Sequence, residues 1–314
     1  MDLKTKMSWD ISLEKLYDIM TDVVLPLRFV VRILKSVLEL STDLLGRILG
    51  SRLVRKHFHL LLSGMLLFGP AFSLWASNYS ILTNANNYLY RKFLKSVWGW
   101  TFLLSGSFII LLSLSSHCSF FLCLRHLSRI ILVGFLWVGC RKGLTLLEDT
   151  TGSCYEPVDS HISSSSSSSS SLLLLHEDQT KSSCLRANLQ WRGYEVSQEV
   201  LVLCLSSLLL VEEISVFGRH VAQMKTPDPS LRIIFLLCVV LLLLWMFLLL
   251  CLLAYFPKFP SQQLGGALGY LGWRVLYQGW YQLGPSWSCP GLPEPGPGAL
   301  LTSKDSEKHK LCVE

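Results

Sequence analysis

Charged residues are scarce in this sequence. Only 16% of its 314 residues are Asp, Glu, Lys or Arg, and 51% are hydrophobic, whereas a soluble domain carries about 25% charged residues. This composition excludes an ordinary soluble globular protein. The clearest apolar run, Ile233–Phe256, contains no charge and exceeds the roughly 20 residues that a helix needs to cross a bilayer. We therefore predict an all-α protein, a polytopic bundle of membrane helices.

The residue spacing of a metal site is also missing. The ten cysteines are scattered, mostly in apolar segments where a thiol behaves as a small hydrophobic group. Neither a C-x-x-C pair nor a Cys/His cluster with metal-site spacing occurs, so we expect no metal and no cofactor. The modest net charge of +6 agrees with the excess of Lys and Arg in the cytosolic loops of membrane proteins. Nucleic acid is therefore not an expected partner.

A cleavable signal peptide is the third absence. Met1–Asp22 carries mixed charges and lacks a hydrophobic core and a small-residue cleavage site, so the first spanning helix is expected to act as the targeting signal. Within the cytosolic N-terminal region, residues 1–56, the stretch Ile11–Leu49 alternates apolar and charged residues at helical spacing. It is too charged to span, and we predict an amphipathic helix in the membrane interface. A solvated helix packed on the protein is the alternative.

Six apolar segments make up the predicted membrane domain, residues 57–283. They are His57–Ala76, Val97–Ser115, Ile130–Leu147, Gln198–Phe217, Leu231–Phe256 and Leu264–Tyr281. The last segment is rich in glycine, which lets a neighbouring helix approach closely. Trp98 and Trp100 open the second segment, and they are interpreted either as an interfacial aromatic belt or as lipid-facing residues. The tail, residues 284–314, is predicted to be disordered and cytosolic.

Six spans place both chain termini on the same side of the membrane. The basic N-terminal region and the basic turns after the second and fourth spans then lie in the cytosol, and the acidic loop 148–197 lies in the lumen. Arg91, Lys92 and Lys95 fall on the lumenal side. Their positive charges disagree with the positive-inside rule.

The lumenal loop 148–197 combines a low-complexity insert with two cysteines. The serine run 163–171 is typical of a flexible segment that cannot build a site. In an oxidising lumen, Cys154 and Cys184 either form a disulfide that closes the loop or remain two free thiols. The sequence leaves both alternatives open.

Two adjacent carboxylates, Glu212 and Glu213, lie on the fourth apolar segment, where each costs roughly 2.5–3.5 kcal/mol on insertion scales. Successive helical residues are about 100° apart, so the two side chains cannot point the same way. In one interpretation they face the bundle interior and bind or orient a polar lipid head. In the other they pair with a basic residue of a neighbouring span, such as Arg141 or Lys142, and fix helix packing.

The segment His117–Arg129 is predicted to connect the second and third spans. Its basic side chains, Arg125, His126 and Arg129, have two interpretations. They contact phosphate head groups, or they form the positive flank that is common on the cytosolic side of membrane helices.

Short motifs along the membrane domain resemble those of the FIT family, the fat storage-inducing transmembrane proteins, and look closest to its member-one branch. In order and spacing they cover about Arg52 to Tyr281, and they are Phe68–Pro70, Trp98–Thr101, Arg125–Arg129, Leu147–Asp149, Thr151–Pro157, Gln190–Tyr194, Val211–Glu213 and Tyr255–Phe256. The resemblance implies residence in the endoplasmic reticulum, cytosolic termini and a role in forming lipid droplets. The family is also similar to lipid phosphate phosphatases, and its catalytic members are thought to cleave fatty acyl-CoA with two lumenal histidines.

The sequence departs from the family pattern at both histidine positions, which hold Glu199 and Pro257. Proline has no proton to transfer, and the negative charge of glutamate would repel a phosphate. We therefore expect no hydrolase activity, and we predict a protein that handles neutral lipid, diacylglycerol or triacylglycerol, among its membrane-lipid partners. The alternative is a lumenal phosphohydrolase that uses Glu199 as its base. A transporter is a third class, but no internal repeat or pair of broken helices supports it.

Overall fold

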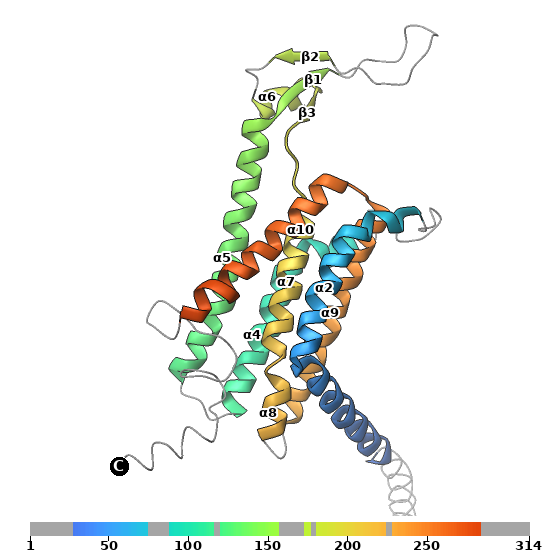
Figure 1. Cartoon of the computed structure of the whole chain (residues 1–314), viewed down its shortest axis with the longest axis vertical. Helices are drawn as coiled ribbons and strands as arrows, with labels where there is room; N and C mark the ends of the chain where they lie inside the picture. The colour runs from blue at the N-terminus through green and yellow to red at the C-terminus, as the bar shows by residue number, and fades with distance from the viewer. Residues whose placement is uncertain are drawn as a thin grey trace, which may run out of the picture.

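The computed structural model describes residues 28–74, 88–115, 120–156, 173–176, 180–223 and 228–283. Most of these residues are helical, and the helices form a bundle with a small sheet beyond one end (Figure 1). The predicted class, an all-α membrane protein, is confirmed. The serine run 163–171 and the tail 284–314 lie outside the described residues. We call the end of the bundle where α7 begins and α9 ends, below the sheet, the sheet end.

The helical elements follow one another along the chain with short connections. In order they are a helix over residues 28–50, α2 (Arg52–Phe68), η1 (Gly69–Leu74), α3 (Tyr88–Lys92), η3 (Leu94–Ser96), α4 (Val97–Ser115), α5 (Phe120–Thr151), α6 (Lys181–Arg186), α7 (Gln198–Ile214), α8 (Phe217–Gln223), α9 (Pro229–Tyr255), α10 (Phe259–Trp273), the π-helical η4 (Arg274–Gly279) and η5 (Trp280–Leu283).

Three helical stretches in the described residues are long and apolar enough to cross a membrane. They are Tyr90–Ser115, Cys123–Thr151 and Pro229–Tyr255. The first two contain the second and third predicted spans, and the last covers the fifth except for Phe256. At the other three positions the structure has the shorter helices α2, α7 and α10, which pack in the same bundle (Figure 1). The predicted second span has the same bounds as α4, Val97–Ser115.

The third helix is much longer than predicted. The sequence predicted a span over Ile130–Leu147 after a connection at His117–Arg129, but α5 begins at Phe120 and ends at Thr151. The predicted connection was therefore wrong over most of its length. The physical reason is that Arg129 is fully buried and forms an ion pair inside the bundle, so its charge is satisfied by protein without a loop.

Helix α7 lies at the centre of the bundle. Every residue from Val200 to Val211 is buried, against α10, α9 and α4. The predicted close approach to the glycine-rich segment is confirmed, because a Cβ on Gly265 would lie 2.4 Å from the Ser197 carbonyl oxygen and one on Gly269 would lie 2.8 Å from that of Leu201. Glycine thus brings α10 into backbone contact with α7.

The helix over residues 28–50 packs on the bundle only through its second half. Arg232 of α9 donates hydrogen bonds to the Thr42 hydroxyl and the Asp43 carboxylate, both at 2.6 Å. The first half exposes apolar side chains, such as Phe29 and Leu34, and projects away from the bundle (Figure 1). The second half follows the alternative in which the helix packs on the protein, and the interfacial location of the first half stays a prediction. Residues 11–27 of the predicted helix lie outside the described residues.

The loop predicted to lie in the lumen contains a three-stranded antiparallel sheet, which the sequence did not predict. Its strands are β1 (Ser153–Glu156), β2 (Leu173–His176) and β3 (Gln190–Arg192), in the order β2-β1-β3. In its register Cys154 lies opposite Trp191. Strands of three or four residues give too short a pattern to be recognised against polar loop sequence.

Replacing Gly265 by alanine should destabilise the bundle by about 1–3 kcal/mol, because the added methyl group collides with backbone at the α7–α10 contact. The measurement is thermal unfolding of the purified protein in detergent. Gly143→Ala on α5 is the matched control, since nothing lies within 4 Å of its Cβ position. Equal melting temperatures for the two variants would contradict the close approach.

Candidate functional site

A cavity of about 560 Å³ opens at the sheet end of the bundle. Its wall is built from the α3–η3 region, the end of α5, the start of α7 and the turn between α9 and α10. The side chains that matter for its chemistry are Arg91, Lys95, Glu199, Lys258, Ser261 and Gln262.

The start of α7 is fixed by Ser197. Its hydroxyl accepts a hydrogen bond from the Val200 backbone N–H at 3.4 Å, and its own N–H donates to the Ser261 carbonyl at 3.1 Å. Serine is a preferred residue at this position because its oxygen satisfies an N–H that has no partner within the helix. Glu199 lies in the first turn, where a carboxylate is favoured by the helix dipole.

The turn between α9 and α10 is held by one buried side chain, Gln262. Its amide nitrogen donates to the carbonyls of Phe256 at 2.8 Å and Leu252 at 3.3 Å, and its oxygen accepts from the Lys258 N–H at 3.2 Å. One glutamine therefore satisfies backbone groups at the end of α9 and at the start of α10. Without it these groups would lack partners at the helix ends.

Charges of both signs surround the cavity. Lys258 and Glu195 form an exposed ion pair at 2.8 Å, and Glu148 accepts a hydrogen bond from Lys181 at 3.0 Å. Arg91, Lys95 and Glu199 have no ion pair among the described residues. Among the described residues, two cations without an ion pair and one such carboxylate thus face the same space, and the excess of positive charge suits an anionic ligand.

The segment that follows α5 is tied together covalently. Cys154 of β1 and Cys184 of α6 form a disulfide with a Cα–Cα distance of 5.9 Å, which is the pairing that the sequence left open. Next to it, Lys181 contacts Glu148 at 3.0 Å and Asp149 at 3.2 Å. The hydrogen bond that Lys181 donates to Glu148, followed by the one that it donates to Asp149, raises the pKa of Lys181 above its ordinary value.

Glu213 lies in a buried polar cluster far from this cavity along α7. Its carboxylate accepts hydrogen bonds from Arg129 of α5 at 2.9 Å and from the Tyr277 hydroxyl of η4 at 2.8 Å. Arg129 and Glu213 are 0% and 2% exposed, so neither reaches a lipid head group. This arrangement agrees with the interpretation in which Glu213 pairs with a basic residue and fixes helix packing.

Glu212 points to another helix, as the 100° rotation per residue requires. Its carboxylate accepts a hydrogen bond from Arg55 of α2 at 3.3 Å. The predicted partners of the two glutamates, Arg141 and Lys142, were wrong, since both are exposed and form no ion pair among the described residues. Sequence spacing alone could not align α5 with α7, because the residue that pairs with Glu213 is 84 positions away.

The two predicted interfacial tryptophans contact other aromatic rings. Trp98 is partly buried and stacks on Trp137 of α5, with ring centroids 6.2 Å apart. Trp100 is 42% exposed and stacks on Phe93 at 5.9 Å. Trp98 therefore contributes to packing between α4 and α5, whereas Trp100 keeps an exposed face.

No group of three or more His, Cys, Asp or Glu side chains within the described ranges is arranged to hold a metal ion.

Comparison with known proteins identifies the family. The family model for the fat storage-inducing transmembrane proteins, FIT, matches residues 78–230. The chain is 54% identical to fat storage-inducing transmembrane protein 1 of Danio rerio over 281 residues, which is 88% of this chain and 96% of that protein. The chain belongs to the FIT family. It is also 35% identical to the protein of the same name from Homo sapiens, over 90% of this chain and 91% of that protein.

A second group within the FIT family carries an enzymatic name. The chain is 30% identical to acyl-coenzyme A diphosphatase FITM2 of Danio rerio over 214 residues, 68% of this chain and 78% of that protein. Its similarity to the member-one branch is thus higher and more extensive. No solved structure matches the chain.

Glu199 and Pro257, which occupy the two positions where the family pattern has histidines, lie differently relative to the cavity. Glu199 lines it, whereas Pro257 is exposed and only its neighbours Phe256 and Lys258 contribute to the wall. Sequence reasoning missed Gln262 and Ser261, whose types and positions carry no distinctive pattern. It noted Arg91 and Lys95, together with Lys92, only as discordant charges, and the structure places Arg91 and Lys95 in the wall of this cavity.

Gln262→Leu should cost about 1–3 kcal/mol of stability, because the variant keeps the side-chain volume but leaves buried backbone groups without partners. Unfolding in detergent, followed by heat or by denaturant, measures the loss. Gln278→Leu on η4 serves as the control, since Gln278 is exposed. A Gln262→Leu protein as stable as this control would contradict the role of Gln262 in the turn.

Proposed function

We propose that this protein promotes the storage of neutral lipid as droplets from the endoplasmic reticulum membrane, and that it does so without cleaving acyl-CoA. The family assignment and the high identity to proteins named fat storage-inducing transmembrane protein 1 support the first part. The lipids that we expect it to handle are diacylglycerol and triacylglycerol.

The observation that carries the second part is the composition of the cavity. Its wall offers Glu199 where the family resemblance requires a histidine, and the second position, Pro257, has no group that can accept or donate a proton. Phosphoryl cleavage needs one group to attack phosphorus and another to protonate the leaving oxygen. The cavity keeps cations that suit a phosphate, but it lacks this pair.

The expected orientation places the sheet end in the lumen and both termini in the cytosol. The Cys154–Cys184 disulfide supports this, because disulfides persist in oxidising compartments. Basic residues on the helix over residues 28–50, including Arg28, Arg32 and Lys35, support a cytosolic location for that helix.

One observation favours a second candidate, a lumenal phosphohydrolase. Glu199 shares the cavity with Arg91 and Lys95, so a bound phosphate would lie near both cations and a possible general base. In this alternative Glu199 activates the nucleophile, and the loss of its charge abolishes activity.

The test combines an enzymatic and a cellular measurement. Wild-type protein should hydrolyse oleoyl-CoA no faster than a detergent blank, whereas Glu199→His with Pro257→His should gain at least tenfold, since a positioned acid or base contributes about 10²–10⁴. Gln198→His with Pro257→His is the matched control, because its first imidazole is one position out of place. In cells, wild type and Glu199→Gln should raise droplet number and triacylglycerol content equally.

Two outcomes would contradict the proposal. Hydrolysis by wild type that disappears in Glu199→Gln would establish the enzyme instead. Unchanged droplet number on expression of wild type would remove the storage function itself.

A further inference from the structure

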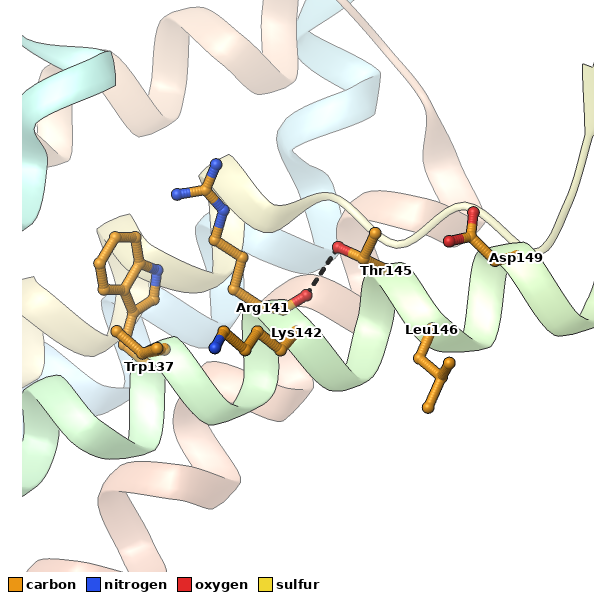
Figure 2. Close-up of a pocket in the computed structure, with 7 residues that line it drawn as sticks. Trp137, Arg141, Lys142, Thr145, Leu146 and Asp149 are labelled. Atoms are coloured by element: carbon orange, nitrogen blue, oxygen red, sulfur yellow. Dashed lines mark hydrogen bonds between the residues drawn. The ribbon is translucent and has the colours of Figure 1, made fainter. Parts of the chain in front are cut away.

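A groove of about 410 Å³, separate from the cavity at the sheet end, lies along the outer face of α5. Two rows of side chains with i, i+4 spacing line it, and they meet side by side on the helix surface. One row is Trp137, Arg141, Thr145 and Asp149, and the other is Val138, Lys142 and Leu146. Figure 2 shows Trp137 and Arg141 projecting to the same side of the helix, with Lys142 beside them. The groove shares no residue with the cavity that contains Glu199.

Within the part of the chain that the structure describes, two cations in this groove have no carboxylate to neutralise them. Arg141 and Lys142 are exposed and form no ion pair among the described residues. Asp149, the acidic residue of the groove, is already bound to Lys181 at 3.2 Å. The Thr145 hydroxyl is also engaged, because it donates to the Arg141 carbonyl at 2.9 Å (Figure 2).

Arg141 is held in place by aromatic stacking. Its guanidinium carbon lies 5.8 Å from the centroid of the Trp137 ring, within the range of a cation–π contact. Trp137 in turn stacks on Trp98 of α4. The arginine is therefore attached to the bundle through two tryptophans, while its hydrogen-bond donors remain available to a ligand.

The position of these charges in a membrane helix calls for an anion. Arg141 and Lys142 lie inside the candidate span Cys123–Thr151, the least buried of the three. Lys142 precedes the last helical residue, Thr151, by nine positions, which is about 13 Å along the helix axis. A lysine side chain is too short to reach that helix end. Charged side chains in a helix that is apolar and long enough to span a membrane are rare, and they are commonly paired with another charge or mark a binding site.

We propose that this groove binds an anionic glycerophospholipid, with its phosphate between Arg141 and Lys142 and an acyl chain against Trp137, Val138 and Leu146. Arginine presents a planar fork that matches phosphate oxygens, and lysine adds a point charge. A phosphate monoester carries nearly two negative charges at neutral pH, since its second pKa is about 6. Phosphatidic acid therefore matches the two cations in charge, whereas neutral lipids and phosphatidylcholine do not.

The experiment uses the full-length protein, purified in detergent and titrated with dioleoyl phosphatidic acid or dioleoyl phosphatidylcholine. Native mass spectrometry counts the lipids that each protein retains. Wild type should retain phosphatidic acid in preference to phosphatidylcholine. Arg141→Gln with Lys142→Gln should weaken this retention about 25-fold, at about fivefold for each cation removed.

Two variants separate the groove from general charge effects. The variant Lys92→Gln with Arg186→Gln removes one lysine and one arginine from exposed positions outside the groove and the cavity. This variant should retain phosphatidic acid like wild type. Arg141→Lys with Lys142→Arg keeps both charges and should retain most of the binding. An excess of glycerol 3-phosphate should not displace the lipid, because it lacks the acyl chains; displacement would overturn the assignment to a lipid.

Equal retention of the two lipids by wild type, or equal retention of phosphatidic acid by wild type and Arg141→Gln/Lys142→Gln, would overturn the proposal. A second measurement does not require the double variant to fold. Wild type irradiated with a photoreactive phosphatidic acid should be labelled on α5 between Trp137 and Leu146, and labelling confined to other helices would overturn the assignment. The proposal does not rest on droplet formation, so its failure would leave the proposed function standing.

Discussion

The hydrogen-bonded ion pair between Arg129 and Glu213 is the constraint on which the rest of this bundle depends. Both side chains are almost fully buried, and Tyr277 completes the coordination of the carboxylate. Removing one partner of a buried pair typically costs 3–5 kcal/mol, because the other charge is left without compensation. The pair joins α5, α7 and η4. It therefore contributes to how α5 lies against α7.

Several features follow from that pair. Helix α5 continues past Arg129 because the charge is neutralised within protein. The π-helical turn η4 carries Tyr277 to Glu213, and Tyr281 of η5 donates to the Arg129 carbonyl at 3.2 Å. Since Arg129 and Arg55 satisfy the two glutamates, Arg141 and Lys142 remain on the outer face of α5. Among the described residues, the core carboxylates thus use Arg129 and Arg55 as partners, and Arg141 and Lys142 form no ion pair.

The sequence predicted what depends on local pattern and missed what depends on distant partners. Val97–Ser115 was predicted with its bounds because bilayer thickness selects an apolar run of that length. The close helix approach at Gly265 was predicted correctly because small residues permit backbone contact. The start of α5 was missed because Arg129 resembles a loop residue until Glu213, far away in the chain, is placed beside it. The sheet was missed because its strands are short and a disulfide ties its central strand to α6.

The cavity at the sheet end was also predicted only in part, because some of its residues depend on contacts between distant parts of the chain. Glu199, which lines the cavity, was found by comparison with a family pattern, whereas Arg91 and Lys95 were noted only for their disagreement with the charge rule. Gln262, which holds the turn that closes the cavity, has no such signal, because its role depends on three backbone groups brought together by folding. The result is a cavity that keeps basic residues around a position where the expected imidazole is replaced by a carboxylate.

The most direct test of this account is a double-mutant cycle at Arg129 and Glu213, measured by unfolding of the purified protein in bicelles. Arg129→Gln and Glu213→Gln should each destabilise the protein by about 3–5 kcal/mol. The double variant should cost at least about 2 kcal/mol less than the sum of the single variants, because coupling energies of this size occur between residues of one network. Additivity of the two changes to within about 0.5 kcal/mol would contradict the central place of this pair.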